Sequence, residues 1–352
     1  MQHDGHPLVS IIIPCRNEEK FIGGCLDSII SSDYPKDRLE VFVVDGMSDD
    51  GTRGILAGYF EKYPFIMLLE NRKRITPCAF NIGIRHAKGE AVMIMGMHAT
   101  YERDYISKCV KYLDEYGADN VGGVMVTVPR DASLAGKAIT LALSHRFGVG
   151  NSVFRTGAKE PVFVDTVFGG CYKRNVFDRV GMFNERLKKS QDMEFNLRLR
   201  KAGGRILLVP DITCYYYAHS DLKSFLLHNW VNGLWAVLPM MYSPIMPVSW
   251  RHLVPLTFVS ILTGSILLSI FHPVFGWLAL SILGVYEFAV MFNSVKISLD
   301  NRDPKFLFVM PVIFASLHFS YGMGSLSGVP RLITSKQFWT ARLFKPRSLM
   351  AG

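Results

Sequence analysis

Side chains of the types that bind ligands follow three apolar stretches in the first part of the chain. They lie in the segments Pro14-Cys-Arg-Asn-Glu18, Asp45-Gly-Met-Ser-Asp-Asp-Gly-Thr52 and Gly96-Met-His98. Carboxylates accept hydrogen bonds and protons, a guanidinium pairs with anions, and an imidazole can hold a metal ion. These residue types predict a site for a polar ligand, and Asp192 adds a carboxylate near the start of a later helix.

The elements that must position these residues alternate along the chain. Strands are expected at residues 8–13, 39–44, 65–69 and 91–95, with helices at about 18–31, 50–63 and 77–87. This alternation indicates βαβ units and a parallel sheet, in which ligands bind beyond the carboxyl ends of the strands. No segment there contains a phosphate-cradling glycine loop, which argues against dinucleotide dehydrogenases and P-loop nucleotide hydrolases.

The chain becomes less regular after residue 122. The pattern predicts a helix at 133–145, a Gly/Ser/Asn-rich loop at 148–157, a strand and turn at 163–170, and a helix at 190–202. Gly203-Gly204 is a plausible stop for the last of these helices, which begins close to Asp192.

The C-terminal third is the most apolar part of the chain. Residues 224–242 are interrupted by polar side chains and resemble a helix that lies at a membrane surface. The apolar runs 253–271 and 274–292 are long enough to form a membrane-spanning hairpin. The run 306–322 is shorter. Three full spans would leave the basic tail outside, against the positive-inside tendency, so this run is re-entrant or interfacial, or the rule is broken here.

Charge and cysteine content limit the function classes. The net charge is +9, and most of the excess lies after residue 250, where basic residues flank apolar runs. That distribution favours a membrane surface over nucleic acid, and the apolar content excludes disorder. The six scattered cysteines are expected to be reduced thiols. Residues 1–7 do not resemble a signal peptide, so the first domain is expected to stay in the cytoplasm.

Two of these segments carry a family resemblance. Val9-Ser-Ile-Ile-Ile-Pro-Cys-Arg-Asn-Glu-Glu19 and Val43-Val-Asp-Gly-Met-Ser-Asp-Asp-Gly-Thr52 resemble the opening of family 2 inverting glycosyltransferases. Later motifs, among them Asp165-Thr-Val-Phe-Gly-Gly170 and Gln191-Asp-Met-Glu194, are similar to bacterial exopolysaccharide glucosyltransferases of the succinoglycan type. The resemblance covers about residues 7–240. It implies an α/β GT-A fold, a Rossmann-like mixed sheet flanked by helices, followed here by interfacial and transmembrane helices.

The resemblance also implies roles for the residues at the strand ends. Asp45 corresponds to an aspartate that accepts a hydrogen bond from uracil, although Asp45-Gly46 is also a turn-forming pair. The donor-binding set expected on this basis is Pro14, Arg16, Glu18, Asp45, Asp50, Arg74 and Gly96. The alternative for Arg16 is a structural role in its turn. The alternative for Asp50 is to cap the helix that follows it.

Asp192 matches the family's catalytic base, which takes a proton from the acceptor hydroxyl as that hydroxyl attacks the anomeric carbon. The family has an acidic pair at this helix start, whereas the pair here is Gln191-Asp192. The alternative role for Asp192 is that of a helix N-cap.

The chain departs from the family at the metal site. The usual Asp-x-Asp holds a divalent cation against the donor diphosphate, but Gly96-Met97-His98 stands in its place. Three alternatives follow. His98 and the diphosphate hold Mn²⁺ or Mg²⁺ together, or cations such as Arg72, Lys73 and Arg74 stabilise the leaving group, or activity is lost.

The sequence therefore predicts a membrane-associated inverting glycosyltransferase that moves a sugar, from a UDP donor, to a polyprenyl-diphosphate-linked saccharide at the cytoplasmic face of the inner membrane. The alternatives are a polyprenyl-phosphate glycosyltransferase and a non-catalytic nucleotide-sugar-binding scaffold. The expected organisation is a catalytic domain at 1–222, an interfacial region at 223–250, transmembrane helices at 251–330 and a basic tail at 331–352. The sequence does not fix the oligomeric state.

Overall fold

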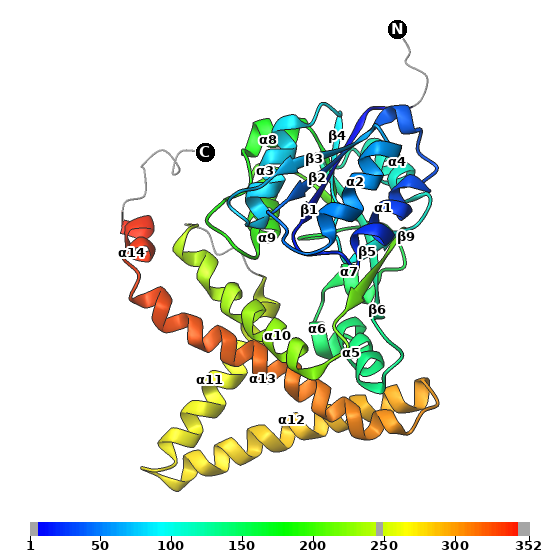
Figure 1. Ribbon diagram of the computed structural model, residues 1–352. Helices are drawn as coiled ribbons and strands as arrows, with labels where there is room; N and C mark the ends of the chain where they lie inside the picture. Colours follow the sequence, from blue (N-terminus) through cyan, green and yellow to red (C-terminus); the bar gives the residue numbers. More distant parts are fainter. Residues whose placement is uncertain (1–5, 244–248, 344–352) are drawn as a thin grey trace. The chain divides into compact units, whose positions relative to one another are not determined.

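A computed structural model describes residues 6–243 and 249–343 of the chain (Figure 1). The chain divides into two compact units, each described here by itself. The first comprises Met1–Val126 and Val153–Tyr217, and the second comprises Thr127–Ser152 and Ala218–Gly352. Residues 127–152 therefore group with the C-terminal helices, which the sequence pattern did not indicate.

A mixed sheet forms the centre of the first unit. Within the described residues it has nine strands, eight of them in the order β3-β2-β1-β4-β8-β6-β9-β5, with β7 beside β9. The strands are β1 Val9–Cys15, β2 Leu39–Asp45, β3 Ile66–Glu70, β4 Ala91–Ile94, β5 Ala99–Tyr101, β6 Asn120–Pro129, β7 Val162–Phe163, β8 Cys171–Lys173 and β9 Ile206–Ala218. The first four pair in parallel as expected, and β8 then pairs antiparallel with β4.

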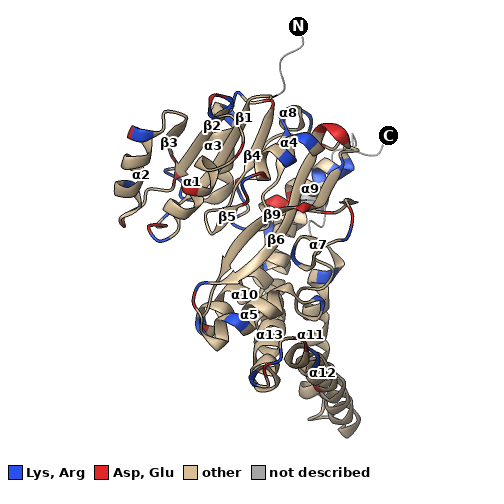
Figure 2. Cartoon of the chain, turned by 90° about the vertical axis from the view of Figure 1, so that its right-hand side faces the viewer, with Lys and Arg blue, Asp and Glu red and all other residues tan. Residues whose placement is uncertain are grey.

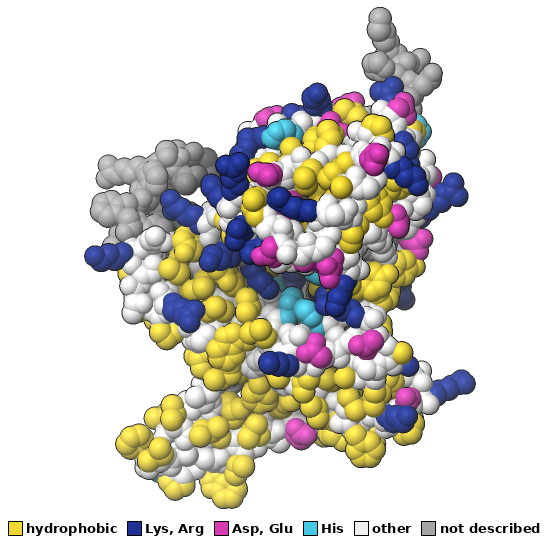
Figure 3. Space-filling model, viewed as in Figure 1, with side chains coloured by type: hydrophobic (Ala, Val, Ile, Leu, Met, Phe, Trp, Pro, Cys, Tyr) yellow, Lys and Arg dark blue, Asp and Glu magenta, His cyan; other side chains and the backbone are white. Residues whose placement is uncertain are grey.

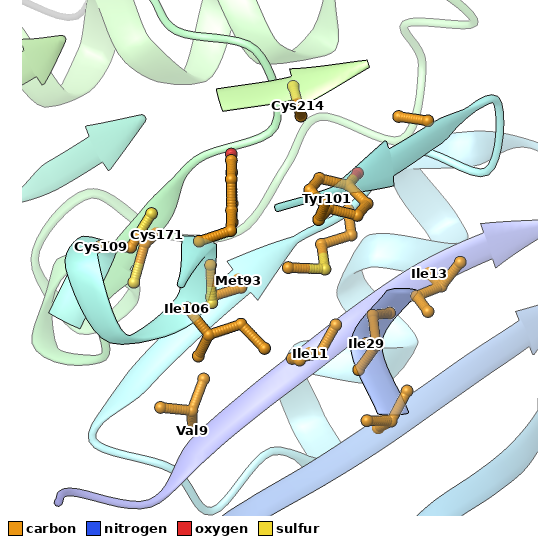
Figure 4. Close-up of a cluster of buried hydrophobic side chains, with 14 of the residues drawn as sticks. Val9, Ile11, Ile13, Ile29, Met93, Tyr101, Ile106, Cys109, Cys171 and Cys214 are labelled. Atoms are coloured by element: carbon orange, nitrogen blue, oxygen red, sulfur yellow. The ribbon is translucent and has the colours of Figure 1, made fainter. Parts of the chain in front are cut away.

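Helices cover both faces of this sheet. They are α1 Ile22–Ile30, α2 Thr52–Lys62, α3 Thr76–His86, α4 Tyr105–Glu115, α7 Val153–Thr156, α8 Asn175–Val180 and α9 Gln191–Lys201, with a short 3₁₀ helix at Lys36–Arg38. Ile11 and Ile13 pack against α1 and α4 on one face (Figure 4), whereas Ile12 packs against α3 on the other. Side chains alternate between the faces of a strand, so an unbroken apolar run is what two buried faces require.

Two expectations for the segment 148–170 need correction. The predicted loop at 148–157 contains the short helices α6, Arg146–Val149, and α7. The strand expected within 163–170 is limited to Val162–Phe163, and the chain turns farther on at Gly169 and Gly170, which have positive φ. All six cysteines are buried free thiols, as predicted.

The second unit is helical. It contains α5 Leu134–Ser144, α6, α10 Leu222–Val237, α11 Leu253–Leu268, α12 Pro273–Asp300, α13 Lys305–Ile333 and α14 Lys336–Leu343, with 3₁₀ turns at Leu238–Met241 and Trp250–His252. In the described part of the chain, three helices are long and apolar enough to cross a membrane. Figure 2 shows few charged residues along α11 and α12, and Figure 3 shows an almost continuous hydrophobic surface there.

The third apolar run belongs to a longer helix than the sequence indicated. Helix α13 has 29 residues, continues through Pro311 and Pro330, and includes Arg331 from the predicted tail. Helix α14 follows, and Lys345 and Arg347 of that tail lie outside the described residues. Length therefore no longer argues against a third span, because 29 helical residues extend about 44 Å.

Helices α10 and α13 approach closely along a line of small residues. A Cβ added to Gly324 would lie 2.1 Å from the Trp230 carbonyl oxygen, and one added to Gly233 would lie 1.9 Å from that of Tyr321. The Ser325 hydroxyl donates a 2.9 Å hydrogen bond to the Gly233 carbonyl across the same contact. Backbone lies against backbone here, so neither glycine has room for a side chain.

We expect Gly324→Val to lower the melting temperature of the protein in detergent, because the valine forces the two backbones apart. Overpacking of this kind costs about 1–3 kcal/mol or more. Gly284→Val in α12 is the matched control, since no atom lies within 4 Å of an added Cβ there. Equal melting temperatures for the two variants would contradict the close α10–α13 contact.

Candidate active site

The parallel strands bring the predicted donor-binding residues to one edge of the sheet. Strand β1 pairs with β2 and β4, and β2 pairs with β3, all in parallel, so their carboxyl ends point the same way. Every predicted site residue except Asp192 lies at or just beyond these ends: Pro14, Arg16 and Glu18 at β1, Asp45 and Asp50 at β2, Arg74 after β3, and Gly96 and His98 after β4.

The loops after β1 and β2 are held together by hydrogen bonds. The Asn17 side chain donates to Asp49 Oδ1 at 2.7 Å and accepts from the Asp49 amide at 3.0 Å. The Glu18 amide donates to Thr52 Oγ1 at 2.7 Å, which fixes the backbone at Glu18. Asn17 has a φ of 55°, a left-handed conformation that asparagine tolerates well. These contacts set the direction in which the Glu18 side chain leaves its loop.

Asp45 is fully buried and already accepts several hydrogen bonds. Its Oδ1 accepts from the Ser48 hydroxyl at 2.5 Å and from the Ser48 amide at 3.1 Å. Its Oδ2 accepts from Arg53 Nε at 2.6 Å. A buried carboxylate needs such partners, because an unpaired charge away from water is costly. Sequence reasoning missed Arg53, which lies in the first turn of α2 and carries no motif of its own.

Asp50 is half-buried, and Arg74 is exposed. The Asp50 carboxylate accepts from the Thr52 amide at 3.0 Å, and hydrogen bonds from Thr52 lower its pKa. It therefore contacts the first residue of α2, but the N-cap of that helix is Gly51, and Asp50 precedes it. Arg74 adopts a φ of 59° in the loop after β3. The neighbouring cations are engaged, since Arg72 contacts Glu70 at 3.5 Å and Lys73 contacts Glu185 at 2.6 Å.

Glu18 and His98 meet at the centre of the edge. Glu18 Oε1 lies 3.2 Å from His98 Nε2, and both side chains are partly buried. The Phe21 ring packs edge-on against the imidazole, and the Tyr217 amide donates to the His98 carbonyl at 2.9 Å. His98 Nδ1 is buried and has no hydrogen-bond partner among the described residues. Nε2 is the ring nitrogen that faces Glu18.

Gly96 precedes this pair by two residues and is closely packed. Its amide donates to the Tyr101 hydroxyl at 2.7 Å, and an added Cβ would lie 3.1 Å from the Phe168 ring. A side chain of any size at this position would have to displace that ring. The lack of a side chain at Gly96 therefore leaves room for the Phe168 ring. The segment Gly96-Met97-His98 contains no carboxylate.

Asp192 occupies the first turn of α9 and is half-buried. Desolvation raises the pKa of its carboxyl group, although the helix-terminal amides of Asp192 and Met193 oppose the shift. No ion pair or hydrogen bond joins this carboxylate to the strand-end loops within the described residues. Raised basicity and freedom from an ion pair are properties that a general base needs.

The rest of α9 is anchored by polar contacts, which leaves Asp192 as its available carboxylate. Glu194 is buried and pairs with Arg198, with Oε1 2.8 Å from Nε. The Arg198 guanidinium also donates to the Met182 carbonyl at 2.8 Å. Asn196 is fully buried and donates to Thr166 Oγ1 at 2.9 Å. These contacts fix α9 and therefore the position of its first turn.

Removing Arg53 should destabilise the protein because it leaves the Asp45 carboxylate buried without its closest partner. We expect Arg53→Ala to lower the free energy of unfolding by about 1–3 kcal/mol, the usual contribution of a hydrogen bond to a charged group. Arg72→Ala removes the same charge from a side chain that is 86% exposed, and it should change the free energy of unfolding by less than about 0.5 kcal/mol. Equal losses, measured by denaturant unfolding in detergent, would show that Arg53 does not support Asp45.

Comparisons with known proteins relate the chain to glycosyltransferases. Residues 10–181 match the family model described as Glycosyl transferase family 2. The chain is 28% identical over 329 residues to the dolichyl N-acetyl-alpha-D-glucosaminyl phosphate 3-beta-D-2,3-diacetamido-2,3-dideoxy-beta-D-glucuronosyltransferase of Methanococcus voltae, an alignment covering 91% of this chain and 97% of the relative. It is 29% identical over 296 residues to the succinoglycan biosynthesis protein ExoA of Rhizobium meliloti (strain 1021), an alignment that covers 84% of this chain and 87% of the relative.

Solved structures share the fold. The mannosyltransferase PcManGT from Pyrobaculum calidifontis, in complex with GDP-Man and Mn²⁺, superposes with a TM-score of 0.59 at 22% identity over 92% of this chain and 88% of that one. S. aureus TarS residues 1–349, in complex with UDP-GlcNAc, superposes with a TM-score of 0.50 at 18% identity over 92% of both chains. These similarities confirm the expected GT-A-like α/β fold. The matched domain and the two relatives identify residues 10–181 as a glycosyl transferase family 2 domain and the chain as a glycosyltransferase.

Proposed function

We propose that this enzyme transfers a sugar from a UDP-sugar to a polyprenyl-diphosphate-linked saccharide. One observation carries the proposal: a single chain combines a family 2 domain with three helices, in its described part, that are long and apolar enough to span a membrane. An acceptor with a polyprenyl tail would be held in that same membrane. The name of the Methanococcus voltae relative, which specifies a dolichyl-linked acceptor, supports this acceptor class. The proposal includes a catalytic unit on the cytoplasmic side of the inner membrane, as the sequence pattern favours.

The donor is proposed to bind at the edge formed by the loops after β1 to β4. Asp45 would accept a hydrogen bond from the nucleobase, and Pro14, Arg16 and Glu18 would border the nucleoside. Both oxygens of Asp45 already accept from Ser48 or Arg53, so one of these donors must yield or share its acceptor when a base binds. Gly96 would border the donor through its backbone, because the Phe168 ring occupies the space for a side chain there. Arg74, without an ion pair among the described residues, would be available to the donor's phosphates.

The Glu18–His98 pair is proposed to hold a divalent cation. Two ligands that bind one ion at right angles, each about 2.1 Å from it, lie about 3.0 Å apart. The observed separation of 3.2 Å between Glu18 Oε1 and His98 Nε2 fits that requirement. Glu18 would replace the carboxylate that Gly96-Met97-His98 lacks. The described residues hold no cluster of three potential ligands, so donor phosphates or water must supply the rest. A bound Mn²⁺ or Mg²⁺ would neutralise charge on the diphosphate.

Asp192 is proposed to act as the base of a single displacement. Its carboxylate would accept the proton of the acceptor hydroxyl while the hydroxyl oxygen bonds to the anomeric carbon. The bond from that carbon to the donor's diphosphate breaks in the same step, which inverts the configuration. Desolvation raises the pKa of Asp192, so its carboxylate accepts that proton more readily than a solvated one would.

A second candidate is a non-catalytic nucleotide-sugar-binding scaffold. The observation that favours it is the absence of both Asp-x-Asp carboxylates from Gly96-Met97-His98. A polyprenyl-phosphate acceptor, without a saccharide, is the remaining alternative within the enzyme class. An activity assay with defined acceptors distinguishes all three.

The assay incubates the protein in detergent with UDP- and GDP-sugars and with polyprenyl phosphate or polyprenyl-diphosphate-linked saccharides. We expect product only from a UDP-sugar and a saccharide-bearing acceptor. Asp192→Asn should lower the rate about 10²- to 10⁴-fold, the usual contribution of a general base. Glu194→Gln alters a nearby carboxylate already paired with Arg198 and tests whether the loss is specific to Asp192. Nucleotide binding without turnover would favour the scaffold.

The pH dependence and stability of Asp192→Asn provide further checks of the base assignment. The wild-type rate should fall at acid pH through a pKa above that of an ordinary aspartate, because the base must be ionised. A raised folded-state pKa also means that ionised Asp192 costs stability at neutral pH. Asp192→Asn should therefore melt at a higher temperature than the wild type at pH 7, with the difference shrinking at acid pH. A lower melting temperature at pH 7 would contradict the raised pKa and show that the Asp192 charge stabilises the first turn of α9, whose N-cap is Ser190.

Metal binding tests the Glu18–His98 pair. Glu18→Gln and His98→Ala should each weaken Mn²⁺ binding in the presence of UDP by at least about 10-fold, since even partners outside the ligand shell contribute that much. Electron paramagnetic resonance of free Mn²⁺ measures this without turnover. Glu19→Gln removes the same charge from a carboxylate that accepts from the Gly51 amide, and it should bind Mn²⁺ as the wild type does. Unchanged affinity in both test variants would refute the site.

A further inference from the structure

Arg155 is a cation without a counter-ion. It lies in α7, a short helix of the first unit. Its Nη1 atom is buried and has no hydrogen-bond partner among the described residues. Desolvation lowers the pKa of the guanidinium, which nevertheless stays protonated. A charge held away from water without a partner is unfavourable unless a ligand completes its environment.

Its surroundings are aromatic. The guanidinium carbon lies 5.6 Å from the centre of the Phe154 ring and 5.8 Å from that of Tyr216. No carboxylate contacts it in the part of the chain that the structure describes. Arg53 and Arg198, the other partly buried arginines among the described residues of this unit, each have a carboxylate oxygen within 2.8 Å of the guanidinium. Aromatic faces hold a guanidinium in place but leave its N–H groups unsatisfied.

A short series of contacts links Arg155 to the edge that holds Gly96 and His98. Tyr216, on which it packs, pairs with Ala99 in the β5–β9 ladder. The next residue, Tyr217, donates its amide to the His98 carbonyl. The Phe168 ring packs on Tyr216 and also faces Gly96. Arg155 is therefore linked to the Gly96–His98 segment through the side chains of Tyr216 and Phe168.

We propose that Arg155 binds the diphosphate of the nucleotide-sugar donor and stabilises it as the leaving group. The inference rests on the proposed function. Arg155 would donate N–H groups to phosphate oxygens. As the acceptor oxygen bonds to the anomeric carbon and its proton passes to Asp192, the carbon–oxygen bond to the diphosphate breaks and that oxygen keeps the electron pair.

The charge of the site supports this role. Glu18 cancels part of the charge of any divalent cation that it holds with His98, so the pair alone neutralises a diphosphate incompletely. Arg72 and Lys73 are engaged by Glu70 and Glu185, and their side chains are largely exposed. Arg155 is desolvated, and an ionic hydrogen bond is stronger in such surroundings than in water.

Binding of UDP and of uridine, measured by calorimetry on the full chain, separates phosphate contacts from base contacts. Arg155→Gln should weaken UDP binding about 10- to 100-fold, as expected for loss of a hydrogen bond to a charged group. Uridine binding should be unchanged. Arg155→Lys keeps the charge but lacks the planar guanidinium, so it should lose less UDP affinity than Arg155→Gln. GDP and guanosine form the parallel pair of probes. Arg72→Gln, the control for net charge, should bind UDP as the wild type does.

Stability without ligand gives the second readout. Removing an unpaired buried charge should raise the melting temperature of Arg155→Gln, and UDP should then stabilise the variant less than the wild type. A lower melting temperature with an unchanged ratio of UDP to uridine affinity would make Arg155 structural and overturn the inference. If Arg155→Gln does not fold, an unchanged ratio in Arg155→Lys overturns it equally. Failure of wild-type protein to bind either UDP or GDP would instead refute the proposed function.

Discussion

The parallel pairing of β1 with β2 and β4 is the constraint on which the candidate site depends. It places three chain reversals at one edge of the sheet, so residues 80 positions apart, Glu18 and His98, come within 3.2 Å. The hydrogen bonds between Asn17 and Asp49 then hold two of these loops together. The end of the antiparallel strand β9 also lies at this edge, because the Tyr217 amide donates a hydrogen bond to the His98 carbonyl. A shift in the register of any of these strands would separate the two side chains.

The sequence was most informative where both faces of an element are buried. The runs that form β1, β2 and β4 are mostly apolar, so they could be recognised as strands to within two residues. Strands β6, β8 and β9 could not be placed, because their antiparallel partners are set by contacts between distant segments. The short helices α6 and α7 were missed for a related reason: four residues are too few to show a helical period.

The same distinction applies to the site. Residues at strand ends could be predicted to share an edge, because parallel topology guarantees it. Arg53 and Arg155 could not be found this way, since what sets them apart is their partners or the lack of them. Helix α13 shows the complementary error. His318 is a polar residue inside that apolar run, and both of its ring nitrogens have partners: Nε2 lies 2.9 Å from the Phe147 carbonyl oxygen and Nδ1 lies 3.1 Å from the Tyr286 hydroxyl. These partners come from α6 and α12, and sequence reasoning had no access to them.

The buried cysteines have a practical consequence. Burial raises the pKa of the Cys25 and Cys214 thiols to about 12, so almost none of either is present as the reactive thiolate at neutral pH. All six thiols are enclosed in the first unit. The native chain therefore offers a nearly silent background for maleimide chemistry. A single cysteine introduced into the turn between α11 and α12 could be labelled from either side of a sealed vesicle, which would give the sidedness of that turn without deleting any native residue.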